Sequence, residues 1–170
     1  MMVLPNALLL PNTLLPLRIF EERYREMLAH SLAHHRMFCV ALMKPKSTEA
    51  ESMKDVFGVA GLGLVRASVT HDDGTSHLIL QGLARVELLD LVQTEPFWIA
   101  AIREKKSKLS NLVESEALAA KVLELCEKLP GPNVPEILKK QLPHLANPEI
   151  IADVVTGAFV QDPFQRQWLL

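Results

Sequence analysis

The chain has 170 residues, which is long enough for one domain with a sizeable buried core. Hydrophobic residues make up 49% of it and charged residues 22%, as in an ordinary globular protein. The net charge of −2 argues against a protein that neutralises many phosphates, because nucleic-acid-binding proteins usually carry a strong excess of lysine and arginine. The net charge does not exclude a basic patch on one part of the surface.

The apolar N-terminus does not have the pattern of a targeting segment. No lysine or arginine precedes Arg18, and Pro5, Pro11 and Pro16 interrupt residues 1–17. A secretory signal needs a basic start and a membrane span needs an unbroken apolar run, so neither fits. We therefore predict a cytoplasmic protein without a membrane partner. Cys39 and Cys126 lie among apolar residues, which predicts two reduced, packed thiols and no disulfide.

The first part of the chain has one helical pattern among short β-like runs. Residues 8–10 are three leucines closed by Pro11-Asn12, which predicts a first strand. Residues 14–20 then lead into a helix that begins near Glu21. Its apolar face has helical spacing and consists of Tyr24, Met27, Leu28, Ser31 and Leu32.

Further β-like runs follow this helix. Residues 37–43 form a continuous apolar run, which is typical of a strand buried on both faces. After an exposed loop, residues 56–69 resume β character and contain three glycines close together, which indicates a bulge, a bend or close backbone packing. These glycines are Gly58, Gly61 and Gly63.

A hairpin is predicted at residues 71–75, because Asp73-Gly74 supplies the positive φ that a tight turn needs. Its return strand is residues 76–81, and further β segments are predicted at residues 84–91 and 97–103. Five or six short strands with one inserted helix predict a small, partly closed barrel. A doubly wound sheet is not expected, because strands and helices do not alternate.

The last part of the chain is helical. Helices are predicted over residues 110–129 and 133–142, and two more begin at Asn147-Pro148 and at Asp162-Pro163, where a capping residue precedes a proline. The fold class is therefore α+β, with a β-rich subdomain at residues 1–106 and a helical bundle at residues 107–170. The predicted apolar face of the first of these helices is Leu118, Val122, Leu125, Cys126 and Leu129.

The sequence offers no constellation that carries chemistry. Residues 58–63 are rich in glycine but lack the lysine and the following helix of a phosphate-binding loop, and no Gly-x-Ser-x-Gly motif is present. His30 and His34 share a helical face without a third ligand, so surface histidines are favoured over a metal site. Asp72 and Asp73 are explained by the turn, and the basic run at residues 103–108 reads as a solvated linker. We predict no enzyme activity, cofactor or metal.

Residues 15–27 resemble the opening signature of the N-terminal, substrate-binding domain of the ATP-dependent protease Lon. In that signature an extended leucine-proline-leucine entry precedes phenylalanine-glutamate and an arginine-tyrosine-arginine helix start, which match Leu15-Pro16-Leu17, Phe20-Glu21 and Arg23-Tyr24-Arg25. Residues 59–65, 78–86 and 147–153 resemble later parts of the same family in order and spacing. The resemblance therefore spans nearly the whole chain.

The resemblance implies a PUA-like pseudo-β-barrel with one inserted helix, followed by a small C-terminal helical bundle. It also implies a non-catalytic module that recruits unfolded polypeptides or an adaptor partner. The chain departs from the full protease in ending at Leu170, without ATPase or protease domains, so we expect a stand-alone member. The alternative is an RNA-binding PUA-like domain, against which the net charge and the 5% aromatic content count. The sequence does not determine the oligomeric state, and a homo-oligomer is one of the alternatives.

Candidate contacts to a polypeptide are flexible methionines and aromatic or branched residues, which adapt to varied partners. A place in the core is the alternative for each of them, least so for Met53, whose neighbours are all polar. The predicted contact residues are Met43, Met53, Val56, Phe57, Phe97 and Trp98.

Overall fold

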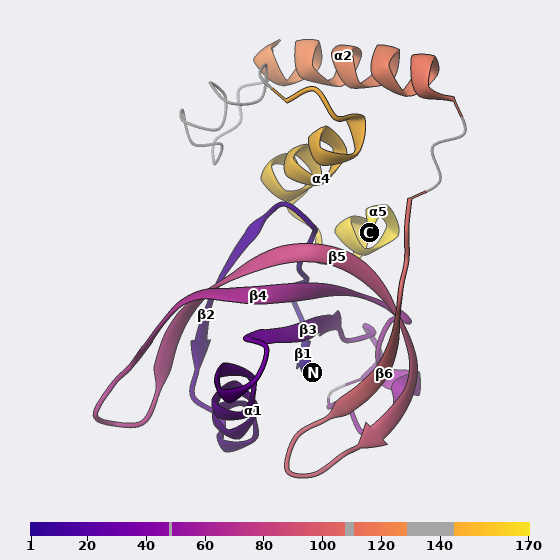
Figure 1. The fold of residues 1–170 in the computed structure, drawn as a ribbon. Coiled ribbons are helices and arrows are strands. Elements are labelled where there is room, and N and C mark those ends of the chain that lie inside the picture. The colour runs from indigo at the N-terminus through magenta and orange to yellow at the C-terminus, as the bar shows by residue number, and fades with distance from the viewer. Residues whose placement is uncertain (48, 108–110, 129–144) are drawn as a thin grey trace. The chain divides into compact units, whose positions relative to one another are not determined.

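The computed structural model describes residues 1–47, 49–107, 111–128 and 145–170 (Figure 1). The chain divides into two compact units, one made of Met1–Lys105 with Leu170 and the other of Lys106–Leu169. The first unit holds a mixed sheet with one α-helix and the second holds helices, so the α+β class is confirmed. The helix predicted at residues 133–142 lies outside the described residues.

The first unit is built on a six-stranded sheet with the order β1-β3-β4-β5-β2, to which β6 is added through β5 (Figure 1). β1 runs parallel to β3, and the other pairs are antiparallel. The path ends at β1 and β2, and no pairing between them closes the described sheet into a barrel. The strands are β1 (Met2–Leu4), β2 (Leu14–Ile19), β3 (Met37–Leu42), β4 (Val59–Thr70), β5 (Ser76–Gln93) and β6 (Ile99–Glu104).

The predicted strand at residues 8–10 is wrong, since these three buried leucines form no strand and Met2–Leu4 is the first strand. The backbone of residues 8–10 lies directly against glycines of β4 and β5. A Cβ atom on Gly61 would lie 2.0 Å from the Leu9 carbonyl oxygen, and one on Gly82 would lie 2.0 Å from the Leu10 carbonyl oxygen. Residues 8–10 therefore cross β4 and β5 in the interior, at positions where only glycine leaves room for their backbone. Close backbone packing is one of the roles predicted for Gly61.

The hairpin prediction is confirmed. The His71 N–H donates to the Thr75 carbonyl at 2.8 Å, and Gly74 takes up the positive φ of +77°. The return strand predicted at residues 76–81 and the further β segment predicted at residues 84–91 are one continuous strand, β5. The Leu10 backbone crosses this strand at Gly82. The extended stretch predicted at residues 97–103 is β6, which begins slightly later, at Ile99.

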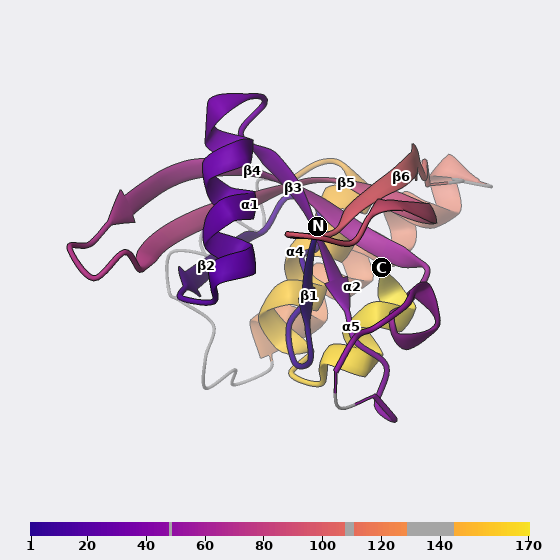
Figure 2. The same cartoon turned by 90° about the horizontal axis from the view of Figure 1, so that it is seen from below.

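The helix α1 (Glu22–Ala33) lies on one face of the sheet, as Figures 1 and 2 show. It buries the predicted face, with Tyr24, Met27 and Leu28 in one core cluster with Leu78 and Leu80 of β5. The strand β3 is buried along most of its length, as its continuous apolar run predicts. Core packing therefore fixes α1 to the sheet, and the first turn of α1 comes to lie beside β1.

The second unit contains α2 (Leu112–Lys128), α4 (Pro148–Phe159) and α5 (Pro163–Leu169). The predicted caps are confirmed, because the Asn147 side chain accepts from the Glu149 N–H at 2.9 Å and that of Asp162 from the Phe164 N–H at 2.7 Å.

One helical face of this unit differs from the prediction. Leu118 and Leu125, which we expected on the inward face of α2, are 61% and 47% exposed, whereas Cys126 is buried. Across the described residues, the structure contains no helix with the length and apolar character that a membrane crossing requires.

Candidate functional site

A hollow of about 260 Å³ lies in the first unit, where β1, the first turn of α1, the end of β3 and the β5–β6 connection meet. Charged side chains stand at three of its lining positions, Glu21, Arg23 and Glu49, and Tyr24 and Thr94 add hydroxyl groups. Its apolar lining comprises Met1, Val3, Leu4, Pro5, Met43, Ala50, Phe97 and Trp98. A concave apolar wall with a few charged groups is the usual form of a binding site.

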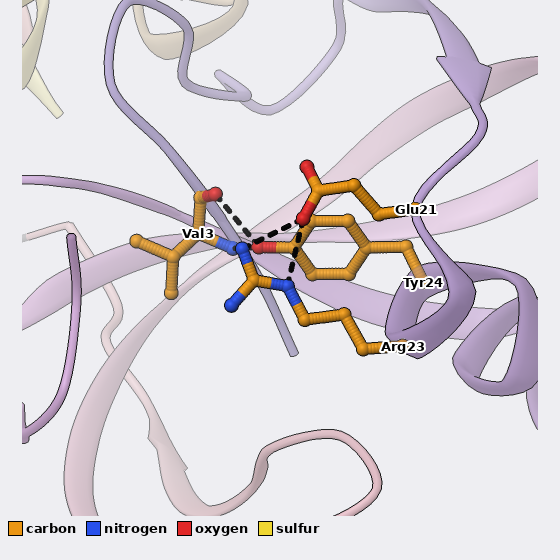
Figure 3. A network of polar contacts seen from close by, with 4 residues as sticks. All are labelled: Val3, Glu21, Arg23 and Tyr24. Atoms are coloured by element: carbon orange, nitrogen blue, oxygen red, sulfur yellow. Dashed lines mark hydrogen bonds and ion pairs between the residues drawn. The ribbon is translucent and has the colours of Figure 1, made fainter.

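Tyr24 joins α1 to β1 beside this hollow (Figure 3). Its hydroxyl donates to the Val3 carbonyl at 2.9 Å and accepts from the Val3 N–H at 3.2 Å. Burial raises the pKa of the Tyr24 hydroxyl, so it remains a protonated donor. One side chain thus satisfies both backbone groups of the middle residue of β1 and holds this wall in place.

Glu21 and Arg23 form an ion pair at the start of α1 (Figure 3). The Arg23 Nε and Nη2 atoms lie 2.8 Å and 2.7 Å from the Glu21 Oε2 atom, and the guanidinium carbon lies 4.7 Å from the centre of the Tyr24 ring. The Arg23 side chain is 43% exposed and the Glu21 side chain 39%, so solvent screens their attraction and the ion pair adds little to stability. Its consequence is positional, since it fixes a charged group of each sign beside an apolar wall.

The β5–β6 connection supplies the opposite wall. The Gln93 Nε2 atom donates to the Phe97 carbonyl at 3.1 Å, and the Met1 amino group donates to the Trp98 carbonyl. Burial lowers the pKa of that amino group to about 6. Phe97 is buried in the core cluster that contains Tyr24, whereas Trp98 is half-buried. Both carbonyls are therefore hydrogen-bonded, which anchors the backbone of this connection.

Of the six residues predicted to contact a polypeptide, the structure brings Met43, Phe97 and Trp98 together in this hollow. The other three do not line it. Val56 is a core residue with 1% exposure, and Met53 packs against the same core cluster as Val56. Phe57 is half-buried at the end of the loop. Which predicted residues touch a partner stays a prediction.

Sequence reasoning missed the polar half of the site. Glu21, Arg23 and Tyr24 have the pattern of a helix start with one buried tyrosine, and this pattern does not predict a binding site. The signal was present, because all three belong to the segment that carries the family resemblance. These three side chains lie near Val3 and Met43 because β1 pairs in parallel with β3, and no local sequence pattern predicts that pairing.

Polar side chains of the hollow are already engaged within the chain. The Tyr24 hydroxyl is held by Val3, and the Glu21 carboxylate is held by Arg23.

Over the described ranges, no three histidine, cysteine or carboxylate side chains are placed to hold a metal ion. The His30 and His34 rings stack with their centres 4.2 Å apart, and the His34 Nδ1 atom lies 2.7 Å from the His30 carbonyl oxygen.

Comparison with known proteins gives one consistent family. The model of the ATP-dependent protease La (LON) substrate-binding domain matches residues 1–170. Lon protease of Desulfosudis oleivorans is 26% identical over 99% of this chain, and that of Dictyoglomus thermophilum is 24% identical over 89%. These alignments cover 21% and 19% of the two proteases, so the chain spans about a fifth of their length.

Two solved structures have a similar fold. The N-terminal domain of the Mycobacterium avium complex Lon protease aligns over 99% of this chain and 87% of its own, with a TM-score of 0.77 and 14% identity. A Lon N-terminal domain protein from Xanthomonas campestris aligns over 91% of this chain and 95% of its own, with a TM-score of 0.56 and 19% identity. At these identities the likeness concerns the fold alone.

Proposed function

The chain belongs to the ATP-dependent protease La (LON) substrate-binding domain family, and from this membership we propose that it is a non-catalytic module that binds unfolded polypeptides. The observation that carries the proposal is the hollow in which Met43, Phe97 and Trp98 converge. Met43 and Trp98 are half-buried in this lining, whereas the Phe97 ring belongs to the core beneath them. A flexible methionine beside an aromatic ring adapts to side chains of different shape, as a receptor for many clients requires.

The size of the hollow favours an unfolded client. About 260 Å³ holds a single large apolar side chain or a few small ones, and folded proteins keep most such side chains inside. The charged groups of Glu21, Arg23 and Glu49 beside the hollow face the polar backbone and neighbouring residues of the bound segment. We further propose a cytoplasmic location, with which the free thiols of Cys39 and Cys126 agree.

Three finer features belong to the same proposal. The fold is of the PUA-like pseudo-barrel type, with a sheet that stays open. Residues 1–106 and 107–170 are the two subdomains of the chain. A protein adaptor is a second kind of partner. RNA binding has no observation in its favour. Arg103, the first residue of the basic run, is paired with Glu87 at 2.6 Å within the sheet.

The test is the affinity of the chain for a permanently unfolded probe, a reduced and carboxymethylated globular protein, measured by fluorescence anisotropy. Met43→Ser removes an apolar group from the wall, and we expect the dissociation constant to rise at least about tenfold, because burial of a methionine side chain contributes about 1.5–3 kcal/mol. The matched control is Met37→Ser at the opposite end of β3, where the side chain is 38% exposed and does not line the hollow.

The control variant is expected to bind as the unchanged chain does. Equal losses in both variants would show general surface stickiness, and no binding by the unchanged chain would refute the proposed function.

A further inference from the structure

The outer half of β4 has an open edge. On the side of β3, pairing covers Gly61–Leu64 of β4 and stops there. The next residue, Val65, is closed by Arg36, whose carbonyl accepts from the Val65 N–H at 2.8 Å and whose guanidinium donates to the Val65 carbonyl at 3.3 Å. Among the described residues, no strand pairs with residues 66–70 on that side. Figure 2 shows the β4–β5 hairpin projecting past α1.

The register identifies the free groups on this edge. The hairpin closes with the bond from the His71 N–H to the Thr75 carbonyl, and pairing then proceeds through Thr70 with Ser76, Val69 with His77 and Ser68 with Leu78. In an antiparallel ladder, hydrogen-bonded and non-hydrogen-bonded pairs alternate. Counting from the closing pair, the N–H and C=O groups of Ser68 and Thr70 therefore point away from β5, toward the open side.

Parts of the other strand edges carry features that oppose the addition of a further strand. The Tyr24 hydroxyl occupies both backbone groups of Val3 in β1. Pro16, in the middle of β2, has no N–H to donate. β6 ends in Arg103 and Glu104, and charged side chains oppose pairing with another strand. Residues 67–70 have neither a charge nor a proline. In the described part of β4, the features of this edge that oppose pairing are Arg66 and the bulge between Val65 and Ala67.

An apolar surface adjoins the open edge. A second hollow, of about 470 Å³, lies over β2, β5 and β4. Two rows of side chains cross these strands on the face opposite Leu78, which packs in the core with α1. The rows are Pro16–Ile79–Ala67 and Arg18–His77–Val69. A strand added beside β4 would place alternate side chains next to Ala67 and Val69, and Val69 is 60% exposed.

We propose that residues 66–70 bind an extended segment of the client polypeptide as an additional β-strand, through the N–H and C=O groups of Ser68 and Thr70. This inference rests on the proposed function and adds a second contact, which recognises backbone where the first hollow recognises side chains. A five-residue edge is about 17 Å long and does not by itself provide the roughly 1,200 Å² of a stable interface between folded proteins. A flexible chain that also occupies the first hollow does not need that area.

Amide hydrogen exchange of the full chain, followed by NMR, tests the contact residue by residue. In the free chain we expect the amides of Ser68 and Thr70 to exchange fast and that of Val69, which faces β5, to exchange slowly. Saturation with the carboxymethylated probe should slow exchange at Ser68 and Thr70 by about tenfold or more.

A matched pair of variants at one position separates backbone from side chain. Ser68→Pro removes the outward N–H, and we expect it to weaken probe binding roughly three- to tenfold, whereas Ser68→Ala keeps that N–H and should bind as the unchanged chain does. Where Ser68→Pro fails to fold, the exchange measurement on the unchanged chain decides.

Each outcome has one meaning. Probe binding that Met43→Ser weakens, with the Ser68 and Thr70 amides left unprotected, overturns this inference and leaves the proposed function intact. No probe binding at all refutes the proposed function and the client with it. Protection of Ser68 and Thr70 that grows with the concentration of the chain alone assigns the edge to a second copy and overturns the client assignment.

Discussion

Gly61 lies in β4 and Gly58 just before it, and the two glycines differ in the space around them. A Cβ atom on Gly61 would lie 2.0 Å from the Leu9 carbonyl oxygen and 2.8 Å from its carbon, both backbone atoms, whereas a Cβ atom on Gly58 would have nothing within 4 Å. Contacts below 3.0 Å are essentially never seen for a Cβ atom, so Gly61→Ala must displace the Leu9 backbone by about 1 Å. Leu9 is fully buried, and its displacement disturbs the core.

We therefore expect Gly61→Ala to lower the free energy of unfolding by about 3 kcal/mol, at the upper end of the cost of overpacking. For a chain of this length the melting temperature should fall by about 6–12 °C. Gly58→Ala is the matched control and should change the free energy of unfolding by less than about 0.5 kcal/mol. Urea unfolding with an unchanged m-value measures both. Equal effects of the two substitutions would refute the crossing of residues 8–10 over β4.

Three further predictions concern stability and reactivity. Tyr24→Phe should lower the free energy of unfolding by about 1–3 kcal/mol in urea unfolding, because the Val3 N–H and carbonyl lose their partner; a change below 0.5 kcal/mol would contradict this. Burial raises the pKa of Cys39 to about 11, so its thiol should react with a disulfide reagent at pH 8 about 100-fold more slowly than free cysteine, and rapid labelling of the folded chain would be inconsistent with it. Burial lowers the pKa of a free amino group at Met1 from 8.0 to about 6, so the unfolded state binds more protons than the folded state between these values. The free energy of unfolding should therefore rise by about 2 kcal/mol from pH 6 to pH 8, and acetylation of that group should abolish the rise.

Local patterns in the sequence predicted most elements of the first unit. The spacing of Tyr24, Met27 and Leu28 predicted α1 and its buried face, and Asp73-Gly74 predicted the hairpin, because both depend on residues close in the chain. The segment at residues 8–10 was mistaken for a strand because three consecutive leucines signal burial without specifying backbone pairing. The glycines that accept this segment lie more than 50 positions away, where only the fold brings them beneath it.

The candidate site was predictable in part for the same reason. Met43, Phe97 and Trp98 were found by residue type alone, which also selected Val56, a core residue. Residue type does not distinguish an apolar side chain on the wall of a hollow from one in the core. The contact of Tyr24 with Val3 depends on β1 lying beside β3, a pairing of two segments separated by a helix and a second strand.

Photo-crosslinking shows whether an unfolded client occupies the hollow beside Met43. The crosslinking residue p-benzoylphenylalanine is placed at position 43 or, as a control, at position 37, and each chain is illuminated together with the carboxymethylated probe. We expect a covalent adduct from position 43 that an excess of unlabelled probe suppresses, and little adduct from position 37. Equal adducts from both positions, or none from position 43 under conditions where the probe binds, would contradict it.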